Sequence, residues 1–256
     1  GKNAWRVYRA DQDTTPEMLG RLTWNARLTE AIGHDLFELH YQAVHRLADR
    51  TVSHLEALIR LRDAVSGDLI PPGVFIPVAE KSNKIVEIDR WVLRRVIRML
   101  AERPDLPAVA VNLSGRSFDD PAMPGHIADL LREHRVSPDR LLIEITETAA
   151  VSDLTDAQRF IESIRQTGCR VCLDDFGAGF ASFAYLKHLQ VDAIKIDGMF
   201  IRNLVQDHDN QVFVRGMLEV ARGLGKETIA ECVEDAAVLD LLARMAEILN
   251  EAAKCS

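Results

Sequence analysis

Charged and amide side chains interrupt six short apolar runs of this sequence. Glutamate stands in HLEAL, LIEIT and IAECV, asparagine in AVNLS, aspartate in CLDDF and lysine in AIKID. In five runs the residues on either side are apolar, and side chains along a strand alternate between its two faces. We therefore expect the polar side chains to share one face while their neighbours pack on the other. They are Glu56, Asn112, Glu144, Asp174, Lys195 and Glu231.

Several carboxylates gathered in one place would repel one another and lose hydration unless they were protonated or bound a cation. Glutamate, asparagine and aspartate together make an all-oxygen set, which is typical of Mg²⁺ or Mn²⁺ sites. The adjacent pair Asp174 and Asp175 suggests a second ion, because one carboxylate could bridge while the other serves the second ion only. Two neighbouring ions are the usual device for in-line displacement at phosphorus.

The polar residues need a scaffold that brings their runs together. The runs alternate with helical patterns, which favours a largely parallel α/β sheet. Seven strands favour a TIM-like (β/α)8 barrel over an open sheet, and barrels carry their active sites at the carboxyl ends of the strands. We expect strands at 36–44, 53–61, 108–113, 141–146, 169–174, 193–197 and 227–232. We expect helices from Thr15 onward and at 85–102, 123–134, 156–167, 183–188 and 211–224.

Composition excludes several classes of protein. A net charge of −8 is a poor match for nucleic-acid backbone, so we expect no DNA partner. No apolar stretch approaches the roughly 20 residues of a membrane span, and no signal peptide is visible. Cys169 and Cys172 form a C-x-x-C inside an apolar run, without a second such pair or an H-E-x-x-H. They are expected to be strand residues in a reducing cytoplasm rather than a redox or zinc motif.

In their order along the chain, these motifs resemble the EAL-domain family of cyclic di-GMP phosphodiesterases. The triplet that names the family is Glu56-Ala57-Leu58. It is accompanied by FELHYQAV, FIPVAEKSNKIVEIDRWVL, VNLS, EITET, LDDFGAGFASF, IKID and AECVE, so the resemblance runs from about residue 20 to about residue 240.

The resemblance implies hydrolysis of cyclic di-GMP to linear pGpG with two Mg²⁺ or Mn²⁺ ions, and a homodimer. Ca²⁺ should enter an oxygen-only site yet inhibit, because it prefers more ligands at longer distances. The implied first-ion ligands are Glu56, Asn112, Glu144 and Asp174, and the second-ion ligands Asp174, Asp175 and Glu231. The resemblance also implies catalytic roles for Lys195, Glu231 and Glu147, with Glu147 bracing the loop after 169–174. It implies substrate contact for Gln42, Arg60 and Lys195, and support of the ligands for Asp197 and Glu234.

The sequence departs from the family pattern at three places. Ala178 stands where the family usually has threonine, and Cys232 stands where it usually has glycine. After Glu234 a helical pattern runs through Leu249, where relatives place an eighth strand with a Q-G motif. We therefore expect a barrel that lacks or does not close its last strand, with the seam open or covered by the tail or a partner.

The first fourteen residues contain WRVYRADQD, which resembles the last strand of a GGDEF domain. We therefore expect residues 1–14 to be a stub or linker from an upstream GGDEF or sensory domain, and residues 15–256 to be the barrel domain. The full-length protein could then be tethered to a membrane through its upstream part.

Three hypotheses follow for function. The first is an active phosphodiesterase, which the complete ligand set favours. The second is a catalytically impaired EAL domain that acts as a cyclic di-GMP receptor, and only the short C-terminal part points to it. The third is an unrelated metal-dependent barrel of the enolase or aldolase type, against which the ordered motifs argue.

Overall fold

The computed structural model describes residues 15–179 and 183–254, and the expected linker at 1–14 lies outside the described residues. The chain divides into two compact units. In the described part, the first unit contains residues 15–38 and 59–88, and the second contains residues 39–58 and 89–254. All the candidate ion ligands belong to the second unit. None of the described helices is long and apolar enough to cross a bilayer.

The first unit is built on α1 (Thr15–Gly33), α2 (Pro72–Lys81) and the short strand β3 (Leu69–Ile70). β3 runs antiparallel to the end of β2 (Val52–Arg62). The sequence did not predict β3 or α2. A two-residue strand carries no alternation to detect, and α2 begins after Pro71 and contains Pro77 in its interior.

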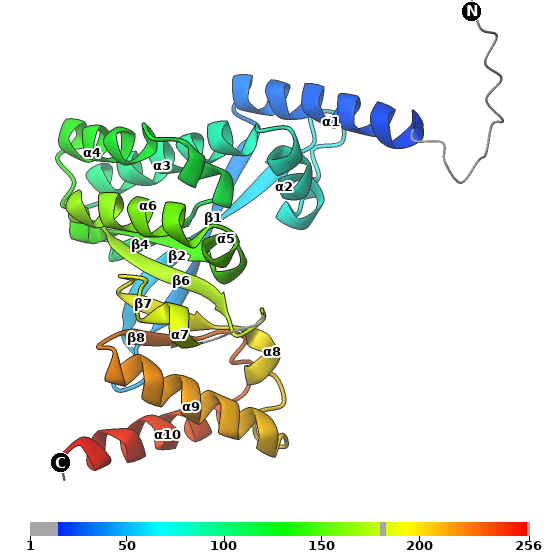
Figure 1. Cartoon of the computed structure of the whole chain (residues 1–256). Helices are drawn as coiled ribbons and strands as arrows, with labels where there is room; N and C mark the ends of the chain where they lie inside the picture. Colours follow the sequence, from blue (N-terminus) through cyan, green and yellow to red (C-terminus); the bar gives the residue numbers. More distant parts are fainter. Residues whose placement is uncertain (1–14, 180–182, 255–256) are drawn as a thin grey trace, which may run out of the picture. The chain divides into compact units, whose positions relative to one another are not determined.

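The second unit holds most of a curled sheet whose strand order is β1-β2-β4-β5-β6-β7-β8 (Figure 1). Pairing is parallel from β2 to β8. β1 and β2 are joined by only residues 46–51, which is too short for a crossover, so this pair is a hairpin. The strands are β1 (Phe37–His45), β2, β4 (Ala108–Asn112), β5 (Leu141–Thr146), β6 (Arg170–Phe176), β7 (Ala193–Ile196) and β8 (Glu227–Ala230).

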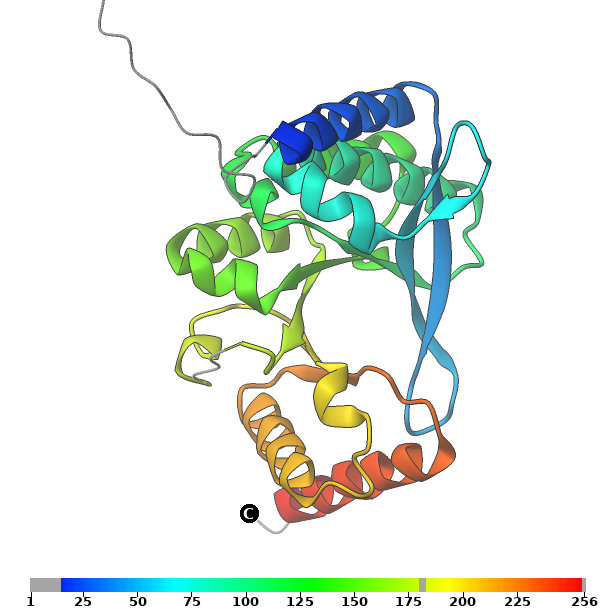
Figure 2. The same ribbon diagram turned by 90° about the vertical axis from the view of Figure 1, so that its right-hand side faces the viewer.

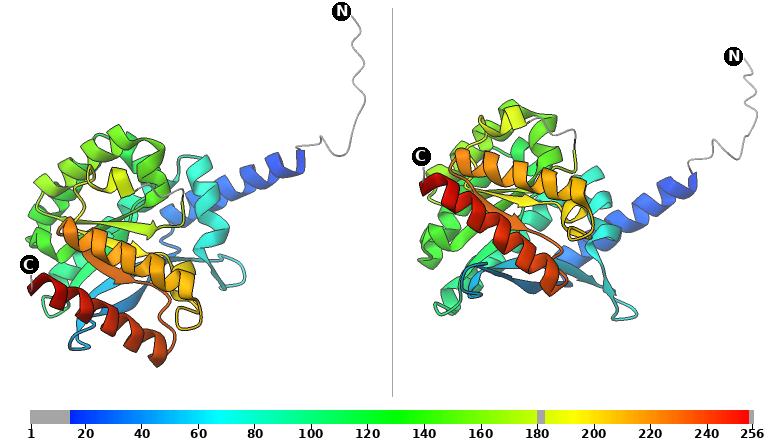
Figure 3. Two further views of the ribbon diagram at one scale, coloured as in Figure 1. Left: turned by 60° about the horizontal axis from the view of Figure 1, so that its bottom comes forward. Right: turned by 90° about the horizontal axis from the view of Figure 1, so that it is seen from below.

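Helices follow the parallel strands, as the alternating pattern predicts. α9 packs on β7 and β8, and α9 and α10 lie side by side in Figures 1, 2 and 3. The helices of this unit, with the start of α3 in the first unit, are α3 (Ile85–Glu102), α4 (Met123–His134), α5 (Glu147–Ser152), α6 (Leu154–Gln166), α7 (Phe183–Leu186), α8 (Gly198–Ile201), α9 (His208–Gly223) and α10 (Ala236–Lys254). Short 3₁₀ turns occur at Gly115–Asp119 and Pro138–Arg140.

Predicted and observed bounds differ mainly where a cap sets the end of an element. α9 begins three residues before the predicted 211, because the side chain of Asp207 accepts a hydrogen bond from the N–H of Asn210. α6 likewise begins before 156, behind the capping carboxylate of Asp153. The last strand ends at Ala230 rather than 232, which places Glu231 in the segment that follows it.

The sheet does not close on itself within the described residues. Its order starts at β1 and ends at β8, and no strand follows β8 in the described part of the chain. The expected absence of a closing strand is therefore confirmed. The helical tail is also present as α10, with Val238, Leu242 and Met245 buried.

An apolar layer lies two positions before the polar residues on their strands. It contains Ala110, Leu142, Cys172 and Ala193, with Ile229 packed against it. Because residues two apart share a face of a strand, the polar side chains lie on the same face as this apolar layer and directly beside it. The two cysteines of the C-x-x-C are free and buried, as expected for core residues.

Candidate metal centre

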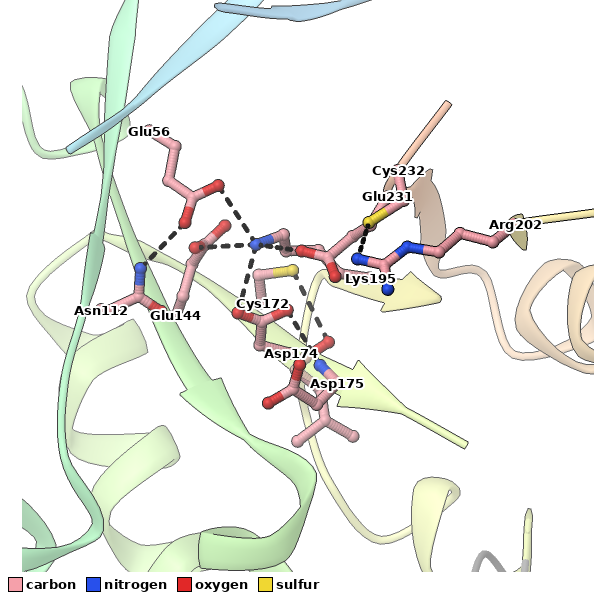
Figure 4. Close-up of polar contacts among 11 residues, drawn as sticks. Glu56, Asn112, Glu144, Cys172, Asp174, Asp175, Lys195, Arg202, Glu231 and Cys232 are labelled. Carbon is pink, nitrogen blue, oxygen red and sulfur yellow. Dashed lines mark hydrogen bonds and ion pairs between the residues drawn. The ribbon is translucent and has the colours of Figure 1, made fainter. Parts of the chain in front are cut away.

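The ammonium of Lys195 lies at the centre of four carboxylates (Figure 4). Lys195 comes from β7 and is only 2% exposed. Its Nζ lies 3.3 Å from Glu56 Oε2, 3.3 Å from Glu144 Oε2, 3.1 Å from Asp174 Oδ2 and 3.0 Å from Glu231 Oε1. These carboxylates come from β2, β5, β6 and the residue after β8. The cluster therefore carries more negative than positive charge.

Electrostatics in the cluster favour an added cation. Burial acts to lower the pKa of Lys195, but the carboxylates around it, Glu144 foremost, raise that pKa well above its ordinary range. Burial raises the pKa of Glu144 to about 8, against the opposing effect of Lys195 and with a contribution from Glu56. Glu144 Oε1 is buried and has no hydrogen-bond partner among the described residues. A buried carboxylate oxygen of this kind is suited to a cation.

The carboxylates form two groups with the spacing of ion ligands. Glu56, Glu144 and Asp174 have ligand atoms within 4.8 Å of one another, and so do Asp174, Asp175 and Glu231. The two groups share Asp174. Beside the first group, the amide nitrogen of Asn112 donates to Glu56 Oε1 at 3.0 Å. The amide oxygen of Asn112 therefore points away from this hydrogen bond. Oxygen-only groups of this composition fit two hard divalent cations.

A backbone irregularity brings the two adjacent aspartates into one group. Side chains next to each other on a regular strand point to opposite faces. At Asp175 the backbone turns into the left-handed region, with φ of 55°, and the β6–β7 register shifts between Leu173 and Phe176. This bulge re-aims Asp175, whose pKa is raised by burial and by Asp174. The adjacent pair Asp174 and Asp175 suggested a shared site in the sequence, but the bulge was not predicted.

Glu147 holds the segment that follows β6. It is the first residue of α5 and is 2% exposed. Its Oε2 accepts hydrogen bonds from the N–H of Gly177 at 2.8 Å and of Gly179 at 3.4 Å, and its Oε1 accepts one from the Tyr185 hydroxyl. The contacts of Glu147 are thus those of a brace for this loop, and residues 180–182 of the loop lie outside the described residues.

The remaining predicted residues occupy different places. Asp197 caps α8 by accepting from the N–H of Met199 at 2.6 Å. Glu234 is exposed between β8 and α10. Gln42 is exposed on β1, and Arg60 belongs to the first unit, where its guanidinium donates to the carbonyl of Ile59. The substrate contacts expected of Gln42 and Arg60 stay predictions.

Sequence reasoning missed the buried carboxylate of Asp89. It is 4% exposed in α3 and accepts from Ser114 N–H at 3.1 Å, Ser114 Oγ at 2.8 Å and Ser117 Oγ at 2.7 Å. Ser114 lies two residues after Asn112, so these bonds tie the end of β4 to α3. The serine of VNLS and the aspartate of EIDRW are the two residues that could have indicated this hydrogen bond. Nothing in the sequence, however, shows that they contact each other.

Replacing Asp89 with alanine should destabilise the chain by about 3 kcal/mol, because three donors lose a charged acceptor in a buried place. Thermal unfolding in EDTA measures this effect. Asp129→Ala is the control, since the Asp129 ion pair with Arg132 is exposed on both sides and should contribute little. Equal melting temperatures for the two variants would contradict this account of the β4–α3 connection.

Comparison with known proteins identifies the class to which this fold and acidic cluster belong. The EAL domain family model matches residues 25–246, so the chain belongs to the EAL-domain family. Cyclic di-GMP phosphodiesterase PdeB of Shewanella oneidensis is 33% identical over 223 residues, which cover 86% of this chain and 26% of that protein. This chain spans less than a third of the length of its first curated relatives.

Two solved structures resemble the chain closely. The PaMucR phosphodiesterase in complex with cyclic di-GMP has a TM-score of 0.80 and 32% identity, covering 87% of this chain and 92% of that one. The FimX EAL domain of Pseudomonas aeruginosa bound to cyclic di-GMP also has a TM-score of 0.80 and 32% identity, with 87% and 90% covered. The fold expected from the sequence is thereby confirmed, as is the family.

Proposed function

We propose that this chain is itself an active phosphodiesterase that hydrolyses cyclic di-GMP to linear pGpG. The observation that carries the proposal is the pair of carboxylate groups that share Asp174 around Lys195. Membership in the family is compatible with catalysis or with binding alone. A full set of oxygen ligands favours catalysis, since it includes the buried Glu144 Oε1, which has no hydrogen-bond partner in the described part of the chain.

Each residue of the cluster has a role in this proposal. Glu56, Asn112, Glu144 and Asp174 would hold one Mg²⁺ or Mn²⁺ ion, and Asp174, Asp175 and Glu231 would hold a second. When bound, the ions would lower the pKa of a water and offset charge at phosphorus. The Lys195 ammonium, kept protonated by its carboxylates, would offset charge that develops on the phosphoryl oxygens.

Residues around the cluster support this arrangement. Glu147 would keep the loop after β6 in place over the second group. Asp197 would fix the start of α8 beside Lys195, and Glu234 would support the segment that carries Glu231. Gln42 would lie near the substrate, and Arg60 would contact one of its phosphates.

The test is incubation of the chain with cyclic di-GMP and either Mg²⁺ or Mn²⁺, followed by chromatographic separation of the nucleotides. The expected result is conversion to pGpG in both metals and none in EDTA. Intact cyclic di-GMP in both metals, with a folded chain, would overturn the proposal.

Ca²⁺ should support substrate binding but lower turnover more than about 100-fold relative to Mg²⁺. The oxygen groups admit Ca²⁺, yet this ion prefers more ligands at longer distances and activates water less. Competition between Ca²⁺ and Mg²⁺ in a turnover assay measures the effect, with binding followed separately by calorimetry. Brisk turnover in Ca²⁺ alone would show that hydrolysis does not depend on tight metal geometry.

We further propose a homodimer, a cytoplasmic location, and control by an upstream GGDEF or sensory domain joined through residues 1–14. The dimer and the upstream control rest on the resemblance, and the cytoplasmic location rests on the free cysteines. Analytical ultracentrifugation at micromolar concentration tests the proposed dimer. A single monomeric species would contradict that proposal.

A further inference from the structure

Cys232 lies directly after Glu231 and adopts an unusual backbone conformation. Its φ is 52°, in the left-handed region that glycine tolerates and other residues rarely occupy. A cysteine held there needs contacts that fix it. Its neighbour Glu231 belongs to the second carboxylate group and contacts Lys195 at 3.0 Å.

Those contacts come from α8. A Cβ placed on Gly198, the first residue of this helix, would overlap Cys232 Sγ and lie 3.0 Å from Cys232 Cβ. At the other end of the helix, the Arg202 guanidinium donates to Cys232 Sγ at 3.2 Å, as Figure 4 shows. Gly198 is buried and its φ is not positive, so space rather than backbone conformation requires glycine there.

The segment that carries Glu231 is therefore fixed at two successive residues. The N–H of Glu231 donates to the carbonyl of Ile196 at 3.3 Å, and the side chain of Cys232 sits against Gly198. Both contacts are made to residues that closely follow Lys195 in the sequence: Ile196 at the end of β7 and Gly198 at the start of α8. A change in the space at residue 198 would push on Cys232 and thereby on its neighbour.

We propose that Gly198 and Cys232 form a coupled positioning pair that sets where the Glu231 carboxylate lies in the second ion group. The inference rests on the proposed function, since it assigns that group to an ion. A side chain at 232 is compatible with correct placement of Glu231 only while residue 198 has none. Cys232 itself is a positioning residue and does not contact the reacting atoms.

Calorimetric titration with Mn²⁺, without substrate, tests the pair. Gly198→Ala should weaken binding of the ion held by Glu231 by about tenfold or more, in the range for residues that orient ligands. Adding Cys232→Gly removes the overlap and should bring affinity to within about threefold of Cys232→Gly alone. In a Glu231→Gln background, Gly198→Ala should have no further effect on ion binding, because the ligand it displaces is gone.

Gly216→Ala is the matched control, because an added Cβ at Gly216 in α9 meets nothing within 4 Å. It should leave Mn²⁺ binding unchanged and raise the melting temperature. Unchanged binding in Gly198→Ala, or equal loss in Gly198→Ala and Gly198→Ala/Cys232→Gly, would overturn the pairing. Failure of the proposed function is seen separately: a wild-type chain that binds Mn²⁺ but leaves cyclic di-GMP intact fails as an enzyme without affecting the pair.

Discussion

Glu144→Gln should reduce turnover of cyclic di-GMP more than 100-fold while the chain remains as stable as the wild type in EDTA. The loss should exceed the roughly 10- to 100-fold cost of losing a residue that only orients a metal ligand. Stability should not fall, because glutamine is isosteric and removes a carboxylate that is 0% exposed and raised in pKa to about 8. Its neutral amide would also reduce the repulsion with the carboxylates of Glu56 and Asp174, whose ligand oxygens lie within 4.8 Å of that of Glu144.

Thermal unfolding with and without Mg²⁺ separates the two effects. The wild type should gain stability from the ion by mass action, whereas Glu144→Gln should gain much less. Glu162→Gln on the exposed face of α6 is the control and should match the wild type throughout. Near-normal turnover in Glu144→Gln would show that the first carboxylate group does not hold a catalytic ion.

Lys195→Met should destabilise the chain in EDTA by about 3 kcal/mol and lower kcat far more than it raises KM. The four carboxylates lose the ammonium that offsets them, and breaking a buried charge cluster on one side is costly. Because Glu56 and Glu231 are partly exposed, solvent screens their charges and limits the loss of stability. The effect on kcat follows if Lys195 acts mainly in the transition state.

Added Mg²⁺ should recover much of the stability of Lys195→Met, since ions at the two groups would replace the missing positive charge. Lys81→Met, at the exposed end of α2, should behave as the wild type. A Lys195→Met chain that melts in EDTA at the wild-type temperature, or that changes only KM, would make Lys195 a simple substrate anchor.

Alternation along the strands predicted most of the site. Charges inside otherwise apolar runs must share a face, and the parallel register then brings that face together from β2 to β8. The register pairs Asn112 with Glu144, so these two residues lie at one level of the sheet. Glu56 lies opposite Ala110 and Asp174 opposite Thr146, so each is offset by two residues from the ligand on the neighbouring strand. The sequence could therefore predict that these side chains meet, but it did not predict the register of the strands.

Features that break the regular pattern were not predictable. The bulge at Asp175 depends on the left-handed backbone conformation of a single residue. The alternation of apolar and polar residues along the strand does not reveal such a conformation. The contacts of Asp89 and of Cys232 join segments 25 and more residues apart through single side chains. The two-residue β3 and the four-residue α8 are too short to show a period.

The most direct test of the central claim is a single-turnover assay with the chain in excess over cyclic di-GMP in Mg²⁺. Under this condition slow product release does not limit the measurement, and bound substrate can only be cleaved or stay intact. The account predicts one exponential conversion of all the substrate to pGpG, absent in EDTA and in Glu144→Gln. Saturable binding in Mg²⁺ with cyclic di-GMP still intact at the end of a long time course would contradict it and make the chain a receptor.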